Sequence, residues 1–223
     1  MPTPALSAVL FDMDGLLVDT EPTWTVAEVE LAERLGGTWT DEIKVSVVGT
    51  RMETAVPVIL AALGHLPTPA LVQDTSDRLL ARMVELYRGP LAAMPGAAEL
   101  HAALRTAGVP VALVSSSYRA LVDAVVQRLG LTFDLVLAGD EVTHAKPHPE
   151  PYGTACTRLG ADPRRAVVLE DSPVGIVSGE AAGCAVVAVP SVAGVHPAPG
   201  PRRLVVASLV EVDVDALRAL SAR

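Results

Sequence analysis

Two pairs of carboxylates stand directly after apolar segments of the chain. Asp12 and Asp14 follow residues 8–11, and Glu170 and Asp171 end a second apolar segment. Carboxylates placed so close together repel each other unless a cation lies between them or one of them is protonated. Oxygen ligands without His or Cys are typical of Mg²⁺ rather than Zn²⁺. The two pairs therefore predict a magnesium site, if the fold brings them together.

A lysine supplies the second chemical signal. The chain contains fifteen arginines and only two lysines, Lys44 and Lys146. In a sequence that avoids lysine so strongly, a solvated surface position would be expected to carry arginine. A compact ammonium is suited to neutralising a phosphoryl oxygen and a carboxylate together. We therefore expect Lys146 to lie in a functional site.

Serines follow a third apolar segment, at residues 115–117. The hydroxyl of Ser115 could donate to a phosphoryl oxygen, and the next backbone N–H groups, including that of Ser116, would face the same space. A serine-rich turn or a helix N-cap explains the run as well. Asp171 or Ser172 could likewise cap the helix that follows them. Capping would explain one polar residue after residues 166–169, but not both Glu170 and Asp171.

The elements that must position these residues alternate between strands and helices. Apolar segments without polar alternation predict strands covered on both faces, at residues 8–11, 109–114, 134–138, 166–169 and 185–189. Helical patterns lie between them, at residues 97–107, 119–129, 150–159 and 174–182. This order predicts a Rossmann-like α/β fold with a doubly wound parallel sheet, in which ligands bind at the carboxyl ends of the strands.

The stretch after the first strand breaks this alternation. Residues 22–35, 51–63 and 70–87 read as helices with no strand between them. We therefore expect an inserted all-helical cap domain at residues 20–91, and an α/β core domain made of residues 1–19 and 92–223. Residues 189–201 are rich in proline and glycine, which predicts an irregular loop.

Composition excludes several classes of protein. The 223 residues are 50% hydrophobic and 19% charged, which excludes a disordered chain, and the net charge of −9 argues against a binder of nucleic acid. Cys156 and Cys184 are expected to be reduced, buried thiols, because two cysteines cannot make a disulfide framework. The N-terminus lacks a basic segment, and no apolar run approaches the ~20 residues that span a bilayer. We expect a soluble, cytoplasmic protein that binds neither nucleic acid nor membranes.

Four motifs in this order resemble those of the haloacid dehalogenase-like hydrolase superfamily. They are DMDGLLVDTEP at residues 12–22, VSS at 114–116, KPHPEPY at 146–152 and EDSPVGI at 170–176. The chain is most similar to the β-phosphoglucomutase and sugar-phosphatase branch, in which a helical cap follows the first motif. The resemblance covers nearly the whole chain, and four ordered motifs are far more specific than any one of them.

The resemblance implies a role for each motif residue. Asp12 would be the nucleophile that forms an aspartyl-phosphate, and Asp14 would protonate the leaving alkoxide and later take a proton from water. Ser115, Ser116 and Lys146 would hold the phosphoryl group. This set of roles implies phosphoester chemistry rather than carbon–halogen cleavage, because dehalogenases of the superfamily generally lack the second acid of the first motif.

The resemblance also implies the metal and its ligands. Mg²⁺ would be bound by Asp12, the backbone carbonyl of Asp14, and Asp171, with Glu170 supporting it directly or through water. The physical need is clear, since an anionic carboxylate approaches an anionic phosphate only when positive charge screens both. Mg²⁺ is therefore the expected cofactor.

Cap residues are candidates for substrate contact. Trp24 stands where β-phosphoglucomutases typically carry a histidine, which favours a sugar phosphatase, although a core position at the base of the cap would also explain a tryptophan. Arg51 could bind a distal phosphate or sugar hydroxyls of the substrate. Alternatively, it is only an exposed arginine at a helix N-terminus. Arg78 and Arg82 are weaker candidates. Lys44 lies in a polar stretch that favours a charged amine, which argues against a Schiff-base lysine.

Together these features predict a monomeric, Mg²⁺-dependent phosphatase acting on a small phosphorylated metabolite, a sugar or polyol phosphate. β-Phosphoglucomutase activity is the alternative. A phospho-receiver module of a signalling protein would share the aspartate, hydroxyl and lysine, but it would have no use for Asp14 or for a helical cap.

Overall fold

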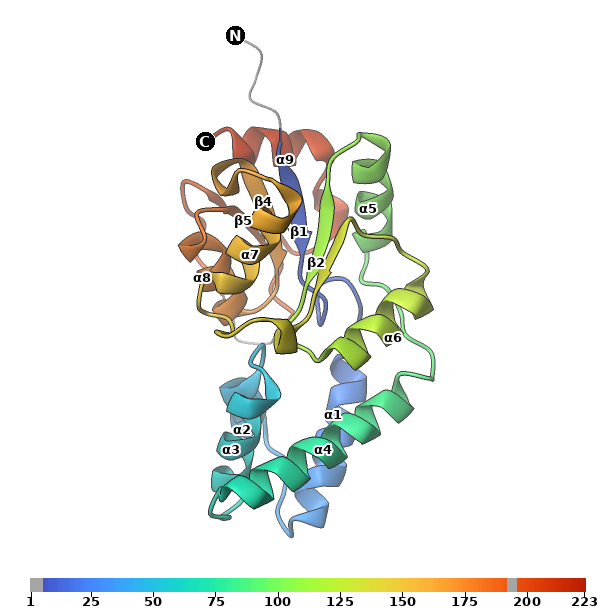
Figure 1. Cartoon of the computed structure of the whole chain (residues 1–223), viewed down its shortest axis with the longest axis vertical. Helices are drawn as coiled ribbons and strands as arrows, with labels where there is room; N and C mark the ends of the chain where they lie inside the picture. The colour runs from blue at the N-terminus through green and yellow to red at the C-terminus, as the bar shows by residue number, and fades with distance from the viewer. Residues whose placement is uncertain (1–5, 192–195) are drawn as a thin grey trace.

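The structure is a computed structural model that describes residues 6–191 and 196–223. Its centre is a six-stranded parallel sheet with the order β3-β2-β1-β4-β5-β6. The strands are β1 (Ala8–Phe11), β2 (Val111–Val114), β3 (Leu135–Leu137), β4 (Ala166–Glu170), β5 (Ala185–Ala188) and β6 (Arg203–Val205). The chain order reverses between β1 and β4, which makes this the topological switch point of a doubly wound sheet. The predicted Rossmann-like α/β class is confirmed (Figure 1).

Successive side chains along each strand pack against opposite layers of helices. Val9 and Phe11 belong to one apolar cluster, and Ala8 and Leu10 belong to the other, as the period of two requires. The first cluster includes α5 (Ala97–Thr106), α6 (Arg119–Leu129) and α9 (Val214–Ser221), and the second includes α7 (Glu150–Leu159) and α8 (Pro173–Ala181). Burial of both faces explains why the strand sequences are apolar throughout.

A helical unit lies beyond the carboxyl ends of the strands (Figure 1). It consists of α1 (Glu21–Arg34), α2 (Asp41–Val47), α3 (Met52–Ala62) and α4 (Pro69–Leu86). Helix α4 packs against α1 and α3, and α2 packs against α3. This unit is where the sequence predicts an all-helical cap, and we call it the cap below. The domain boundaries at residues 19/20 and 91/92 stay a prediction.

Among the α-helices and β-strands of the described residues, α2, β6 and α9 were not predicted. Helix α2 has only seven residues, too few for a hydrophobic repeat to stand out, and Thr40 caps it by accepting a hydrogen bond from Ile43 N–H at 3.4 Å. Strand β6 is a half-buried edge strand of three residues. The N-terminal residues 1–5 and part of the predicted loop, residues 192–195, lie outside the described residues.

The remaining sequence predictions concern cysteines and membranes. Cys156 and Cys184 are buried free thiols, as predicted, and their sulfur atoms lie 3.9 Å apart, within reach of a thiol hydrogen bond but not joined in a disulfide. Within residues 6–191 and 196–223, no helix combines the length and the apolar character needed to cross a membrane.

Candidate active site

The strands bring the predicted polar residues to one edge of the sheet, at the switch point. Asp12 follows β1 and Ser115 follows β2. Glu170 ends β4 and Asp171 follows it, and the pairing of β4 with β1 aligns Phe11 with Leu169. These side chains are buried, although each begins where an apolar strand stops. Burial of so many polar groups is costly unless they bind one another or a ligand.

Lys146 lies at the centre of this edge and is only 5% exposed. Its ammonium is 2.5 Å from Asp12 Oδ1 and 2.6 Å from Glu170 Oε1, and it also donates to the carbonyl oxygen of Val114 at 3.1 Å. The segment that carries it precedes α7 and is more than a hundred residues from Asp12 in sequence. The prediction that this lysine joins the acid cluster agrees with the structure.

Glu170 is saturated with hydrogen bonds. Its Oε1 accepts from Lys146 and from the Tyr152 hydroxyl at 2.6 Å, and its Oε2 accepts from the backbone N–H groups of Asp171 and Ser172 and from the Ser172 hydroxyl. Gly175 of α8 leaves room for this carboxylate, since a Cβ there would lie 1.8 Å from Oε1. Glu170 therefore holds Lys146 in place and has little capacity left for a direct metal bond.

The cluster carries excess negative charge, because one ammonium faces three carboxylates. Burial, aided by Glu170, raises the pKa of Asp12 well above its ordinary value, although Lys146 opposes the shift. Burial and Glu170 also raise the pKa of Asp171, to about 8. Burial works to lower the pKa of Lys146, but the two carboxylates that it contacts outweigh this effect and raise it.

A divalent cation fits this arrangement. One carboxylate oxygen from each of Asp12, Glu170 and Asp171 lies within 4.8 Å of the others. Positive charge placed here would stabilise the ionised forms of Asp12 and Asp171, whose raised pKa values reflect burial among like charges. Glu170 is already saturated, so Asp12 and Asp171 are the carboxylates of this group that could contact such an ion, and oxygen ligands suit a hard ion such as Mg²⁺.

Asp14 lies beside the acid cluster and is held by side chains from both parts of the molecule. Oδ1 accepts hydrogen bonds from the Thr20 hydroxyl (2.7 Å), the Tyr87 hydroxyl (3.1 Å) and the Trp24 indole N–H (3.4 Å). Oδ2 accepts from the hydroxyls of Ser117 (2.8 Å) and Ser115 (3.4 Å). Trp24 therefore takes part in the site rather than only in the core at the base of the cap.

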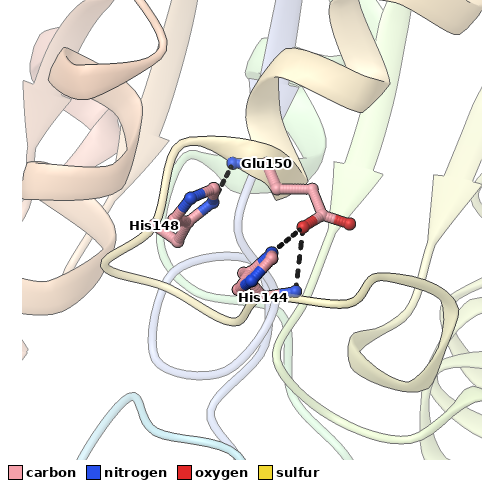
Figure 2. A group of neighbouring side chains, drawn as sticks. All are labelled: His144, His148 and Glu150. Atoms are coloured by element: carbon pink, nitrogen blue, oxygen red, sulfur yellow. Dashed lines mark hydrogen bonds and ion pairs between the residues drawn. The ribbon is translucent and has the colours of Figure 1, made fainter.

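The loop that carries Lys146 is stiffened by Glu150, the first residue of α7 (Figure 2). Its carboxylate accepts hydrogen bonds from the backbone N–H groups of Thr143 and His144 at 2.7 and 2.9 Å, and it lies 2.7 Å from His144 Nδ1. These contacts, with that of the Thr143 N–H the largest, lower the pKa of Glu150 to about 2. His148 accepts from the N–H of Glu150 at 3.1 Å, so this histidine has a structural role.

A pocket of about 100 Å³ separates the acid cluster from the cap. Asp12, Asp14, Asp171, Ser116 and Ser117 are among the residues that line it from the core, and Trp24 and Arg51 are among those that line it from the cap. Ser116, predicted to bind phosphate, donates its hydroxyl to the carbonyl oxygen of Gly49 in the cap at 3.2 Å. The pocket leads directly to the predicted nucleophile.

Of the three cap arginines that were candidates for substrate contact, Arg51 alone is among the described residues that line the pocket. Arg51 donates to the core carbonyl oxygens of Gly139, Val142 and Thr143 at 3.2, 3.4 and 2.8 Å, because it faces the loop after β3. Contact of Arg51 with a substrate stays a prediction, but its hydrogen bonds already join the cap to the core.

Arg78 and Arg82, the weaker candidates, pair with acids of the cap, and their contact with a substrate stays a prediction. Arg78 pairs with Asp74 one turn away on α4, and Arg82 pairs with Glu30 of α1. Neither is among the described residues that line the pocket above the acid cluster. Their spacing on α4 directs them to the outer surface of the cap, where they bind acids of the cap's own helices.

Several side chains that hydrogen-bond to the acids of the site were not predicted from the sequence. Thr20 and Tyr152 stand inside the motifs that carry the family resemblance, and Ser117 ends the serine run, so these three had a local signal. Tyr87 had none, because it lies 73 residues from Asp14 and follows the end of α4. Burial and the Asp14 carboxylate raise the pKa of Tyr87 well above its ordinary value, which keeps its hydroxyl a donor.

Comparison with known proteins agrees with this geometry. The family model described as haloacid dehalogenase-like hydrolase matches residues 6–183. Hexitol phosphatase B of Escherichia coli (strain K12) is 31% identical over 195 residues, covering 86% of this chain and 87% of that protein. A phosphorylated carbohydrates phosphatase of Thermotoga maritima is 30% identical over 184 residues, covering 80% of this chain and 82% of that protein.

A solved structure shares the whole architecture. A mutant of CbbY from Rhodobacter sphaeroides, in complex with xylulose-(1,5)bisphosphate, superposes with a TM-score of 0.85 at 28% identity, covering 96% of this chain and 99% of that chain. The match to the family model and these relatives confirm the resemblance read from the motifs. The chain belongs to the haloacid dehalogenase-like hydrolases.

Proposed function

We propose that this protein is a Mg²⁺-dependent phosphatase that hydrolyses a small phosphomonoester, a sugar or polyol phosphate, through an aspartyl-phosphate on Asp12. Its class, a phosphoric monoester hydrolase, follows from its family and from its phosphatase relatives. The observation that carries the proposal is the buried contact of Lys146 with both Asp12 and Glu170. A lysine in this position would reduce the repulsion between the Asp12 carboxylate and an anionic phosphate, and so allow the two to approach.

In the first half-reaction, an oxygen of Asp12 attacks phosphorus and the bond from phosphorus to the ester oxygen breaks. Asp14 donates a proton to the departing alkoxide. Lys146 and Ser115 bind the oxygens of the transferring group and offset its charge. The Tyr87 and Trp24 donors orient Asp14 from the cap side.

In the second half-reaction, a water attacks phosphorus, its proton passes to Asp14, and the bond from phosphorus to Asp12 breaks. Inorganic phosphate leaves and the Asp12 carboxylate is restored. Asp12, Asp171 and the backbone carbonyl of Asp14 would hold Mg²⁺, and Glu170 would act through Lys146 and the turn after β4. When bound, the ion supplies positive charge beside the phosphoryl oxygens.

The remaining parts of the proposal concern partners and location. The relatives named as hexitol and carbohydrate phosphatases support a small phosphorylated partner. A monomer that works in the cytoplasm, without nucleic acid or membrane, completes the proposal.

The test is phosphate release from a panel of sugar and polyol monophosphates, with Mg²⁺ and with EDTA. We expect release that depends on Mg²⁺ and disappears in Asp12→Asn. Conversion of β-glucose 1-phosphate into glucose 6-phosphate faster than phosphate release would contradict the proposal in favour of a mutase. Absence of metal-dependent release from every ester by the folded protein would contradict both.

A further inference from the structure

Glu28 of α1 is a buried acid that lines the pocket. It is 9% exposed, and its Oε2 has no hydrogen-bond partner among the residues that the structure describes. Burial, aided by Glu21 and opposed by Lys44, raises its pKa to about 7. An unsatisfied buried acceptor destabilises a protein, so its presence in a pocket calls for a ligand that donates to it.

The position of Glu28 on α1 places it beyond the reacting groups. Glu21, Trp24 and Glu28 follow a spacing of three and four residues, so they share one face of the helix, and all three line the pocket. Trp24 reaches Asp14 at 3.4 Å. Glu28 follows one turn later, about 6 Å further along the helix axis. A substrate whose phosphate lies at Asp12 would extend its carbon chain toward Glu28.

The cations near this end of the pocket are already engaged. Lys44 is 2.6 Å from Glu21 Oε2 and donates to the Thr25 hydroxyl at 3.2 Å. Arg51 donates to three carbonyl oxygens of the core. Lys44 and Arg51 balance the charges of Glu21 and Glu28, but both cations already donate to groups of the protein. The free hydrogen-bonding capacity at the cap end of the pocket is therefore that of an acceptor, which leaves a second phosphate without a free donor and favours a ligand that donates.

We propose that the cap end of the pocket is a binding subsite for the hydroxyl groups of the substrate, with Glu28 accepting their hydrogen bonds and setting specificity for polyhydroxy monophosphates over bisphosphates. This inference rests on the proposed function, because it concerns the carbon chain of the same phosphoester. A site that depends on hydrogen bonds to hydroxyls discriminates strongly against analogues that lack them, since its own polar group is then left buried and unpaired.

The test compares three six-carbon substrates: glucitol 6-phosphate, hexyl phosphate and glucitol 1,6-bisphosphate. We expect the wild type to have the highest kcat/KM for the hydroxylated monophosphate. Glu28→Leu should lower kcat/KM for glucitol 6-phosphate about 10- to 100-fold relative to hexyl phosphate, mainly through KM. Glu28→Gln, which keeps an acceptor oxygen, should retain most of the preference.

Glu30→Leu is the matched control, because it removes an exposed glutamate from the same helix, where it pairs with Arg82 away from the pocket. It should change kcat/KM for both monophosphates by less than about twofold. An equal loss on both monophosphates in Glu28→Leu would assign Glu28 a structural role and overturn the inference.

The wild type alone decides the matter if the Leu variant fails to fold. Equal kcat/KM for hexyl phosphate and glucitol 6-phosphate, or a preference for the bisphosphate, overturns the inference while leaving the phosphatase proposal intact. No Mg²⁺-dependent phosphate release from any of the three substrates overturns the phosphatase proposal itself.

Discussion

The two walls of the pocket differ in how their polar groups are satisfied. The core wall includes Asp12, Asp14 and Asp171, and Lys146 contacts Asp12 from outside the residues that line the pocket. Lys146 binds Glu170, and Tyr152 and the turn after β4 fill the remaining acceptor sites of Glu170. On the cap wall, the acceptor Glu28 Oε2 remains without a partner among the described residues. The hydrogen bonds of Lys146 and Glu170 are therefore made before a substrate arrives, whereas within the described residues that of Glu28 Oε2 is not.

This difference separates chemistry from recognition. Groups that stabilise a transferring phosphoryl must be held rigidly in advance, because reorganisation during the reaction would cost rate. Groups that recognise the rest of the substrate can keep unused hydrogen-bonding capacity in the free protein, because the bound ligand supplies their missing partners. Substitutions on each wall can test whether the core wall serves catalysis and the cap wall serves substrate recognition.

The largest effect is expected on the core wall, from Asp12→Asn. The amide is a poor nucleophile, so kcat should fall by at least about 10⁴-fold, the scale on which the loss of a nucleophile is felt in other enzymes. Single-turnover phosphate release measures it, and circular dichroism checks that the variant is folded. Retention of most activity would remove Asp12 from its assigned role.

Removal of the lysine should damage stability as well as activity. Lys146→Met leaves Asp12 and Glu170 buried without their cation, which should lower the free energy of unfolding by about 3–5 kcal/mol. Urea unfolding in EDTA measures this change. Lys44→Met is the matched control, since the only other lysine forms a partly exposed ion pair worth about 1 kcal/mol or less. Similar losses in both variants would erase the contrast between the walls.

Glu28 should make the free energy of unfolding depend on pH. Folding raises its pKa from 4.5 to about 7, so the folded state holds its proton more tightly and stability falls as pH rises between these values. Glu28→Gln has no such proton to lose. Its stability relative to the wild type should therefore increase from pH 5 to pH 8, by up to about 3 kcal/mol. Urea unfolding at both pH values checks the difference, and a constant difference would show that Glu28 is solvated.

The smallest effect is expected from Arg51→Ala, which removes the hydrogen bonds from the cap to three core carbonyl oxygens. If Arg51 chiefly holds the cap against the core, kcat/KM should fall about tenfold for every substrate, whatever its chain carries. Steady-state kinetics on glucitol 6-phosphate and hexyl phosphate measure both losses. A loss confined to one of the two would instead place Arg51 in substrate recognition.

Most of the catalytic core was predictable because its signals are local. Apolar strands covered on both faces are visible as uninterrupted runs, and the rule that ligands bind at strand ends points to the residue after each run. Asp12, Ser115 and Glu170 were found in this way. Lys146 follows no strand directly, and only the scarcity of lysine and its family motif identified it.

The cap was less predictable because its contacts are long-range. Tyr87 reaches Asp14 from 73 residues away, and Arg51 donates to carbonyl oxygens 88 to 92 residues further along the chain. Arg51, Arg78 and Arg82 are chemically alike in the sequence, yet one joins the cap to the core and two bind acids on the outer surface of the cap. Helix α2 was missed because seven residues carry too little periodicity.

The order of most strands and helices and the identity of the acids and the lysine could be predicted from the sequence, because hydrophobic pattern and residue chemistry are local properties of the chain. Which of these groups have all their hydrogen bonds, and which keep acceptor capacity, is visible only in the folded structure. Hydrogen-bond partners are chosen by packing between distant segments. The completeness of Glu170 and the open acceptor at Glu28 Oε2, judged within the described residues, therefore emerge only in the folded chain.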